Sequence, residues 1–371
     1  MPVTTYQPIT GDLVEGDDVV ARNHRAPANA VRTRKQASAN WWSEGASMPE
    51  GSPSVLIIRL DAIGDALALT PLLAAFRRHA IPVDIALRPE NAGVFSSRAA
   101  PNIVEAHIAL RSSARSNIAA IEALGRELQR RAYSHVLVAT EDPAGYRLAA
   151  AIGAAARVGF VNARGKPLKS MWARRLLTHP IARSAGLDPK GPHESEVLFQ
   201  LGSPLLPRER PTRDLTELRP LVLEREPELD ERVAIQITDK WERLGIPIAE
   251  VVDLIWRVSA YGPTHLLSAQ NEAAYAQRIA AAAGVAVSSF EHLDPWKSAI
   301  GAAKAIVTPD SGALHVAGMI GTPVVAIFPP QRGFALQVAR WAPWAAPHRI
   351  VRSGDQWPAR ATDALAELLA L

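Results

Sequence analysis

Short, β-rich apolar runs alternate with Ala- and Leu-rich stretches of helical period from residue 54 to about residue 160. The apolar runs predict strands over residues 55–60, 83–87, 104–110, 135–140 and 157–160. The stretches between them predict helices over residues 65–79, 91–98, 116–131 and 144–153. Strand, helix, strand repeated in this order builds a parallel sheet with helices on both faces.

The same alternation restarts at residue 233, after a segment dense in proline and charge over residues 204–231. The predicted strands there cover residues 233–237, 265–269, 285–289, 305–310 and 323–328, and the predicted helices cover 247–260, 271–283, 295–303, 312–320 and 359–370. The sequence therefore predicts an α/β fold with two doubly wound, Rossmann-like domains in tandem. In such sheets ligands bind outside the carboxyl ends of the strands, here in a cleft between two facing domains.

The first 52 residues differ from the rest of the chain. They are poor in large aliphatic side chains and show no sustained period of 2 or 3.6, which predicts a polar, disordered extension. The proline-rich segment suits a linker that carries little core of its own. The predicted organisation is an extension over 1–52, an N-terminal α/β domain over 53–215, a linker over 216–230 and a C-terminal α/β domain over 231–371.

Composition narrows the class of protein further. The 371 residues include no cysteine, which excludes a disulfide framework, a thiolate metal site and a cysteine nucleophile, and disfavours an oxidising compartment. The net charge of +4 is small for this length and gives no sign of a nucleic-acid binder. No apolar run approaches the roughly 18–20 residues that span a bilayer, and no signal peptide is visible, so the expected address is the cytoplasm.

The first segment with candidate chemistry places Gly64 and Asp65 just after the predicted strand 55–60, at the start of a helix. Asp is a favoured helix N-cap, so Asp65 has a purely structural interpretation. In the functional interpretation, its carboxylate removes a proton from a substrate hydroxyl, while Gly64 lets another molecule approach the backbone. Asp61, in the same loop, is a lesser candidate, and the loop lacks the G-x-G-x-x-G fingerprint of dinucleotide binding.

A second segment, residues 305–330, repeats this arrangement: a strand, then Asp310-Ser311-Gly312, then a helix that carries His315. The free amides in the first turn of that helix form an anion site, and Gly312 allows a phosphate to come close. A structural interpretation stays open here too. Asp310 and Ser311 could cap the helix, and a single histidine at helical spacing is more often packed than functional.

Together the two segments resemble glycosyltransferase family 9, the heptosyltransferases. These enzymes begin with a VLIIR-like strand, a loop ending in I-G-D and a helix with T-P-L-L, which matches VLIIRLDAIGDALALTPLL at residues 55–73. Their C-terminal D-S-G, H-x-A and G-T-P-V-V-A elements match TPDSGALHVAGMIGTPVVAIFPP at residues 308–330. Fainter likeness lies at RVGF (157–160), His193-Glu194, Lys240-Trp241 and Trp341-x-Pro343.

The resemblance implies a fold of the GT-B type, with the acceptor on the N-terminal domain and the nucleotide sugar on the C-terminal one. It implies inverting, metal-independent transfer of a heptose from an ADP-sugar to lipopolysaccharide core, without a cofactor. Asp65 matches the family's general base, and Lys240 matches a lysine that steadies the donor diphosphate. The nucleotide-holding loop and helix start are matched by Asp310, Ser311, Gly312 and His315.

Two departures from the family pattern leave alternatives open. Residues 236–239 read QITD where a glycine-containing turn such as H-P-G-A is usual, and Phe328-Pro329-Pro330 replaces F-G-P. The added Asp239 would lie beside the donor phosphate. The alternatives are a transferase that uses another nucleotide sugar or a protein or metabolite acceptor, and a catalytically silent scaffold that binds a nucleotide sugar.

A basic segment bears on the acceptor. Residues 157–183 contain seven basic side chains and no acidic one. One interpretation is a solvated cationic surface. The other is a surface for an anionic glycolipid or for the inner leaflet of a membrane, where each Lys or Arg contributes roughly 1 kcal/mol; nucleic acid ranks below both because no recognition motif is present. The candidate acceptor or membrane-surface residues are Gly64, Arg164, Lys166, Lys169, Arg174 and Arg175.

Overall fold

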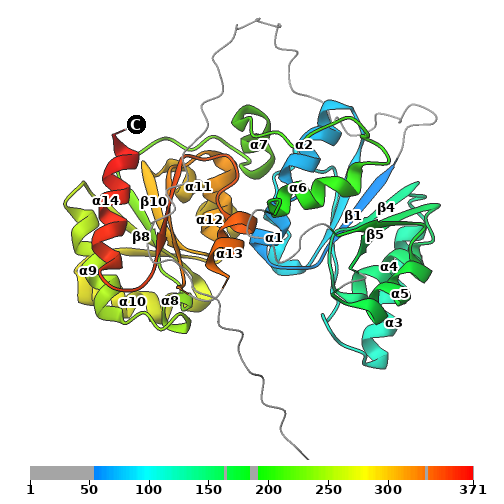
Figure 1. Cartoon of the computed structure of the whole chain (residues 1–371), viewed down its shortest axis with the longest axis horizontal. Helices are drawn as coiled ribbons and strands as arrows, with labels where there is room; N and C mark the ends of the chain where they lie inside the picture. The colour runs from blue at the N-terminus through cyan, green and yellow to red at the C-terminus, as the bar shows by residue number, and fades with distance from the viewer. Residues whose placement is uncertain (1–53, 163–164, 184–190, 331–332, 371) are drawn as a thin grey trace, which may run out of the picture.

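Two parallel sheets of six strands each form the framework of the chain, which the computed structural model describes over residues 54–162, 165–183, 191–330 and 333–370. The extension predicted for residues 1–52 and the predicted site residue Arg164 lie outside the described residues. The predicted α/β fold with two doubly wound domains of the GT-B type is confirmed (Figure 1).

The N-terminal sheet has the strand order β3-β2-β1-β4-β5-β6, and all its neighbours are parallel. Its strands are β1 (Val55–Arg59), β2 (Val83–Leu87), β3 (Ile103–Glu105), β4 (His135–Val138), β5 (Ala156–Val161) and β6 (His179–Ala182). The helices of this half are α1 (Ile63–Leu67), α2 (Thr70–Arg78), α3 (Arg115–Gln129), α4 (Pro143–Ile152), α5 (Pro167–Leu176), α6 (Glu194–Phe199) and α7 (Leu215–Val222).

The C-terminal sheet has the order β12-β11-β10-β7-β8-β9, which is the same topology starting from β7. Its strands are β7 (Val233–Gln236), β8 (Thr264–Ala269), β9 (Val287–Phe290), β10 (Ala305–Pro309), β11 (Val324–Phe328) and β12 (His348–Arg352). The helices are α8 (Lys240–Arg243), α9 (Ile248–Ser259), α10 (Ala273–Ala283), α11 (Leu293–Ala302), α12 (Gly312–Ile320), α13 (Phe334–Trp341) and α14 (Trp357–Leu369).

Three hydrophobic clusters explain how the domains are joined. One lies on the outer face of the N-terminal sheet under α3, α4 and α5, and another on the outer face of the C-terminal sheet under α9, α10 and α14. The third and largest takes buried side chains from both domains, including Leu67 from α1 and Leu314 from α12. Helices α1, α2, α6 and α7 therefore face α11, α12 and α13 between the sheets (Figure 1).

The prediction of one continuous helix over residues 65–79 is wrong, because the structure has two helices there, α1 and α2. In a continuous helix the amide of residue 71 would bind the carbonyl of Leu67, but Pro71 has no N–H. The hydroxyl of Thr70 donates to the Leu67 carbonyl instead, at 2.6 Å. The break leaves α1 as a single short helix that follows the carboxyl end of β1.

The helix predicted over residues 91–98 is also absent. Only a 3₁₀ turn, Pro89–Asn91, forms there. Farther along, the Ser96 amide donates to the Leu221 carbonyl at 2.9 Å, and the Ser96 hydroxyl donates to the Pro220 carbonyl at 2.6 Å. These bonds to α7 replace the helical hydrogen bonds that the periodicity predicts.

The expectation that the proline-rich linker carries little core is wrong over α7. Leu218 and Leu221 are fully buried, and Asp214 caps the helix by accepting a hydrogen bond from the Thr216 amide at 2.9 Å. The helix packs on α2 and α12 and so on both domains. The charged residues of the segment made the short apolar face of this amphipathic helix hard to recognise in the sequence. The domain boundaries themselves stay predictions.

Candidate functional site

The two segments singled out by sequence meet where each sheet reverses its strand order. In the N-terminal sheet this point lies between β1 and β4, and in the C-terminal sheet between β7 and β10. A cavity of about 290 Å³ lies there, between the domains, and is called the Asp65 cavity. Every residue predicted for catalysis or donor binding lines it, as does Gly64: Gly64, Asp65, Lys240, Asp310, Ser311, Gly312 and His315.

Asp65 is the third residue of α1, and Ala62 is the N-cap, so the interpretation of Asp65 as the N-cap is wrong. Its carboxylate Oδ1 instead accepts a hydrogen bond from Nη2 of buried Arg59 at 2.9 Å. The same guanidinium lies 3.4 Å from Asp61 Oδ2. One positive charge thus serves two carboxylates on the N-terminal wall of the cavity.

The pKa of Asp65 is raised above its ordinary value. Burial is the largest cause, and the negative charges of Asp61 and Glu194 act in the same direction, while Arg59 and the Ala62 amide oppose them. A carboxylate with a raised pKa is a stronger base, which suits proton removal from a hydroxyl. Asp65 remains partly open to the cavity, with 31% of its side chain exposed.

Lys240 opens α8 on the opposite wall of the Asp65 cavity. Its ammonium donates to the backbone carbonyl of Asp310 and lies 3.5 Å from Oδ2 of the same residue. That carboxylate also accepts a weaker hydrogen bond from Gln337 Nε2 at 3.4 Å. Asp310 therefore does not cap α12; it holds Lys240 at the end of β10, beside the helix start.

The first turn of α12 faces two cavities at once. Ser311, its N-cap, makes no capping bond with its side chain, and its hydroxyl pairs with Thr308 at 2.9 Å. Ser311 and Gly312 line both the Asp65 cavity and a larger one of about 590 Å³, called the Trp296 cavity. Because the first amides of a helix have no intrahelical partner, an anion that bridges the two cavities would meet free donors.

The Trp296 cavity combines an apolar wall with a few polar groups. Phe290, Leu293 and Trp296 line it, together with Glu272. Burial raises the pKa of Glu272, whose Oε1 accepts hydrogen bonds from the Thr238 hydroxyl at 2.7 Å and the Asp239 amide at 3.1 Å. No motif marks this carboxylate in the sequence, where it follows β8.

The altered segment 236–239 is accommodated without blocking either cavity. The side chain of Asp239 pairs with Arg243 at 2.7 Å on the surface and lines neither cavity. Gln236 is the last residue of β7, and its Oε1 accepts a hydrogen bond from Trp296 Nε1 at 2.9 Å. The expectation that Asp239 lies beside the donor phosphate is therefore not supported by its position.

Gly64 is required by a contact between the domains. A Cβ atom on Gly64 would lie 2.2 Å from Cδ2 of His315, a distance that no side chain tolerates. The space that the sequence assigned to an approaching substrate is therefore filled by the His315 ring. This ring also packs in a T-shaped arrangement on the Trp341 ring, with the two ring centroids 5.6 Å apart. Burial lowers the pKa of His315 to about 4, so the ring is neutral at pH 7.

The predicted basic surface divides into two parts. Lys166 pairs with Glu141 at 2.6 Å, and Lys169 donates to the Glu141 carbonyl, so both are tied to an acidic residue of the same domain. Arg174 and Arg175 are exposed on α5. Of the predicted surface residues that the structure describes, only this second pair fits the expectation of a free cationic surface.

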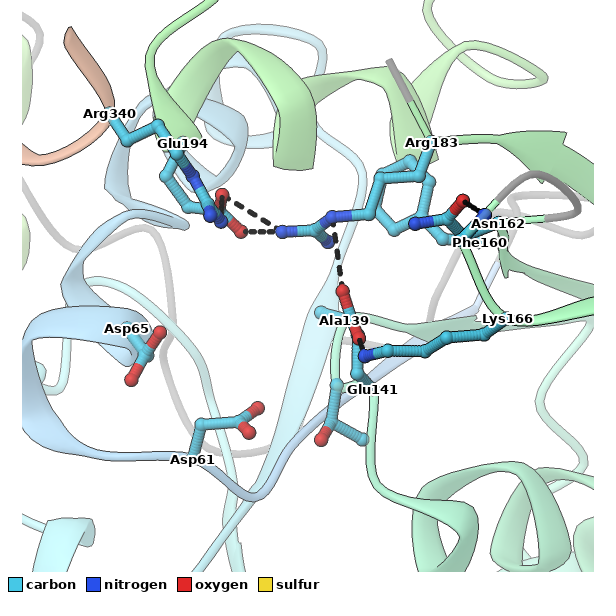
Figure 2. A network of polar contacts seen from close by, with 12 residues as sticks. Asp61, Asp65, Ala139, Glu141, Phe160, Asn162, Lys166, Arg183, Glu194 and Arg340 are labelled. Atoms are coloured by element: carbon cyan, nitrogen blue, oxygen red, sulfur yellow. Dashed lines mark hydrogen bonds and ion pairs between the residues drawn. The ribbon is translucent and has the colours of Figure 1, made fainter. Parts of the chain in front are cut away.

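A buried ionic network that the sequence did not predict lies next to the cavity (Figure 2). Glu194, with a side chain 2% exposed, accepts hydrogen bonds from Arg183 at 2.7 and 2.9 Å and from Arg340 at 2.9 Å. Burial raises the pKa of Glu194, but Arg183, Arg59 and Arg340 outweigh it and hold the pKa below its ordinary value. The sequence feature that could have indicated Glu194 is the His193-Glu194 pair, one of the fainter likenesses to the family.

The described ranges show neither a metal-binding cluster nor a membrane-spanning helix. Across residues 54–162, 165–183, 191–330 and 333–370, no group of three or more His, Cys, Asp or Glu side chains is arranged to hold a metal ion. Among the helices of the same ranges, none has both the length and the apolar character of a membrane span.

Solved structures share this architecture over most of the chain. A glycosyltransferase family 9 protein from Veillonella parvula superimposes with a TM-score of 0.67 at 15% identity, covering 86% of this chain and 97% of that one. Heptosyltransferase WaaC of E. coli with ADP gives 0.64 at 18% identity, covering 85% and 99%. ADP-heptose lipopolysaccharide heptosyltransferase II of E. coli gives 0.63 at 18% identity, covering 85% and 98%. Such likeness establishes the fold, which is that of GT-B glycosyltransferases.

The C-terminal domain also carries sequence similarity to a known family. Residues 256–368 match the family model described as glycosyltransferase family 9 (heptosyltransferase). Among curated protein sequences, none matches the chain. The resemblance to this family is thus confirmed by sequence over residues 256–368, and the shared fold agrees with it over most of the chain.

Proposed function

We propose that the protein transfers a heptose, or a closely similar sugar, from an ADP-sugar to an anionic acceptor of the lipopolysaccharide-core type, with inversion and without a metal ion. The observation that carries the proposal is the Asp65 cavity. Its acceptor-domain wall presents one carboxylate of raised pKa, and its donor-domain wall presents the Lys240 ammonium and the free amides at the start of α12.

The chemistry assigns one role to each wall. Asp65 takes the proton from the acceptor hydroxyl as that oxygen attacks the anomeric carbon from the face opposite the diphosphate. The new C–O bond forms while the bond to the diphosphate breaks, and the negative charge that develops on the leaving nucleotide is stabilised by Lys240 and the α12 amides. Fixed positive groups of this kind supply what a metal ion would otherwise provide.

The Trp296 cavity is assigned to the nucleoside of the donor. Its volume of about 590 Å³ suits a nucleoside, and Trp296 and Phe290 offer apolar faces beside which a base can pack. Glu272 can accept hydrogen bonds from ribose hydroxyls. An adenine nucleotide is favoured because WaaC of E. coli, which shares the fold, was solved with ADP and with ADP-2-deoxy-2-fluoro heptose.

Helix α5 is assigned to the acceptor lipid and the cytoplasmic face of the inner membrane. Leu168 and Met171 are 78% and 57% exposed, and Arg174 and Arg175 are exposed on the same helix. Apolar side chains beside arginines suit an anionic lipid surface. The double variant Arg174→Gln, Arg175→Gln should sediment less with vesicles that contain anionic phospholipid; sedimentation equal to the parent protein contradicts this assignment.

The donor is tested by thermal unfolding in the presence of ADP-heptose, a GDP-sugar and a UDP-sugar, followed by product analysis with a lipopolysaccharide-core acceptor. The proposal expects protection by the ADP-sugar and a glycosylated product of inverted anomeric configuration. Protection by a different nucleotide sugar would show that the donor is not an ADP-sugar. Binding of a nucleotide sugar without turnover on any acceptor would show that the protein is a scaffold and not an enzyme.

A further inference from the structure

The carboxylate of Glu194 is bound by arginines from both domains. Arg183, which follows β6, approaches this carboxylate from one side, and Arg340 of α13 approaches from the other (Figure 2). Arg183 is itself held by Glu141, whose Oε1 lies 3.1 Å from Arg183 Nε. The N-terminal domain thus fixes Glu194 firmly, and its remaining hydrogen-bonding capacity is directed at the C-terminal domain.

The neighbouring residue makes a second bond to the same end of α13. His193 Nδ1 accepts a hydrogen bond from the Ser195 amide at 3.0 Å, so the ring proton is on Nε2, which donates to the Ala342 carbonyl at 2.9 Å. Burial lowers the pKa of His193 to about 4, which keeps this neutral tautomer at pH 7. Together, His193 and Glu194 form what is called here the α6 clamp.

The helix held by the α6 clamp forms a wall of the Asp65 cavity. Gln337 and Trp341 of α13 line that cavity, and Gln337 donates to the carboxylate of Asp310. No residue of α13 is fully buried, so this helix lacks the core anchor that holds α12. Its position therefore depends on partly buried contacts and on the polar bonds at its carboxyl end.

We propose that Glu194 is a positioning residue for sugar transfer, which places α13 through Arg340 so that the Asp65 cavity keeps its shape around the reacting groups. The inference rests on the proposed function for its kinetic consequence. Its structural consequence, an α13 held by Glu194 and Arg340, is independent of which sugar is transferred. Glu194 does not line the cavity, but its negative charge also raises the pKa of Asp65, so the role of α13 is tested by Arg340→Gln, which leaves that charge in place.

The test compares Arg340→Gln and Glu194→Gln with the control Arg257→Gln, which removes an arginine paired to Asp253 on the outer helix α9. Arg340→Gln should lower kcat by roughly tenfold or more, since small misplacements at a reacting centre are costly. The affinity of ADP should fall much less than kcat, because no α13 residue lines the Trp296 cavity assigned to the nucleoside, and α13 borders only the part of the site assigned to the diphosphate. Amide hydrogen exchange over residues 334–341 should be faster in both variants and unchanged in the control.

Non-additivity provides a second check. The double variant Glu194→Gln, Arg340→Gln should be no slower than the worse of the two single variants, because both remove the same contact. Unchanged exchange over residues 334–341 in Arg340→Gln overturns the proposal, as does a parallel loss of kcat and ADP affinity. Should the parent protein transfer no sugar, the proposed function fails, and the exchange result still decides whether Glu194 and Arg340 hold α13. Because Arg340 is 28% exposed, its variant is expected to fold even where Glu194→Gln does not.

Discussion

The two walls of the Asp65 cavity are built from the same topology but carry opposite chemistry. The wall from the N-terminal domain ends β1 with carboxylates, Asp61 and Asp65, around the buried Arg59. The wall from the C-terminal domain ends β7 and β10 with an ammonium, Lys240, and with the open first turn of α12. One fold thus places carboxylates on one side and positive groups on the other, which in the proposed reaction are the proton acceptor and the binding site for the diphosphate.

A similar contrast separates two carboxylates of the N-terminal domain. Asp65 shares one guanidinium with Asp61, and burial raises its pKa. Glu194 is more deeply buried, yet it receives two guanidinium groups and its pKa is lowered. Burial alone therefore does not decide whether the pKa of a carboxyl group is raised or lowered; the number of cations paired with it also counts.

The largest expected effect comes from removing the base on the acceptor wall. Asp65→Asn should lower kcat by roughly 10²- to 10⁴-fold, the range for a general base. Steady-state kinetics with saturating donor measures this, with Asp253→Asn, an exposed position on α9, as the matched control. Transfer at the parent rate would show that the base lies elsewhere.

The donor wall is expected to show a smaller loss of a different kind. Lys240→Met should lower kcat/KM on the order of 10²-fold, because one preorganised positive group is lost from the leaving diphosphate. Lys304→Met is the control, since Lys304 pairs only with the exposed Glu231 among the described residues. An equal effect in the two lysine variants would contradict the assignment of Lys240.

The contact that brings the walls together can be broken at Gly64. Gly64→Ala places a methyl group 2.2 Å from His315 and should destabilise the protein by about 1–3 kcal/mol, seen as a lower Tm. Gly93→Ala is the control at the same domain interface, because its Cβ would lie at an ordinary 3.5 Å from Leu293. Equal Tm values for the two variants would show that α1 and α12 are not closely packed.

The smallest expected effect is a shift in the pH profile. The groups that act on Asp65 are Arg59, Asp61 and Glu194, and Asp61→Asn removes one of the two negative charges that raise its pKa. The carboxylate of Asp65 then ionises more readily, so the acid limb of kcat/KM should move to lower pH. A profile that stays in place, or moves to higher pH, argues against Asp65 as the titrating base.

The sequence was sufficient for the fold because alternating strands and helices have clear periods. It was also sufficient to bring seven candidate residues to one cavity, since Gly64-Asp65 and Asp310-Ser311-Gly312 both follow central strands. It failed at α1 and α2, where Pro71 interrupts a regular helical pattern that periodicity alone continues.

The remaining residues of the site could not be predicted because their roles depend on long-range pairing. Glu194 and Arg340 are 146 positions apart, and neither lies in a motif with a defined chemistry. Glu272 follows an ordinary strand and gains significance only from the cavity beside it. Conversely, the sequence predicts a free cationic surface at Lys166 and Lys169, because no residue near them in the chain indicates that Glu141 binds them.

The division of labour between the two walls is tested most directly by titrating ADP, with calorimetric detection, into the parent protein and into Asp65→Asn and Lys240→Met. The account predicts the parent affinity for Asp65→Asn and a clearly weaker affinity for Lys240→Met, since only the donor wall holds the nucleotide. Loss of ADP affinity in Asp65→Asn together with parent affinity in Lys240→Met would contradict it.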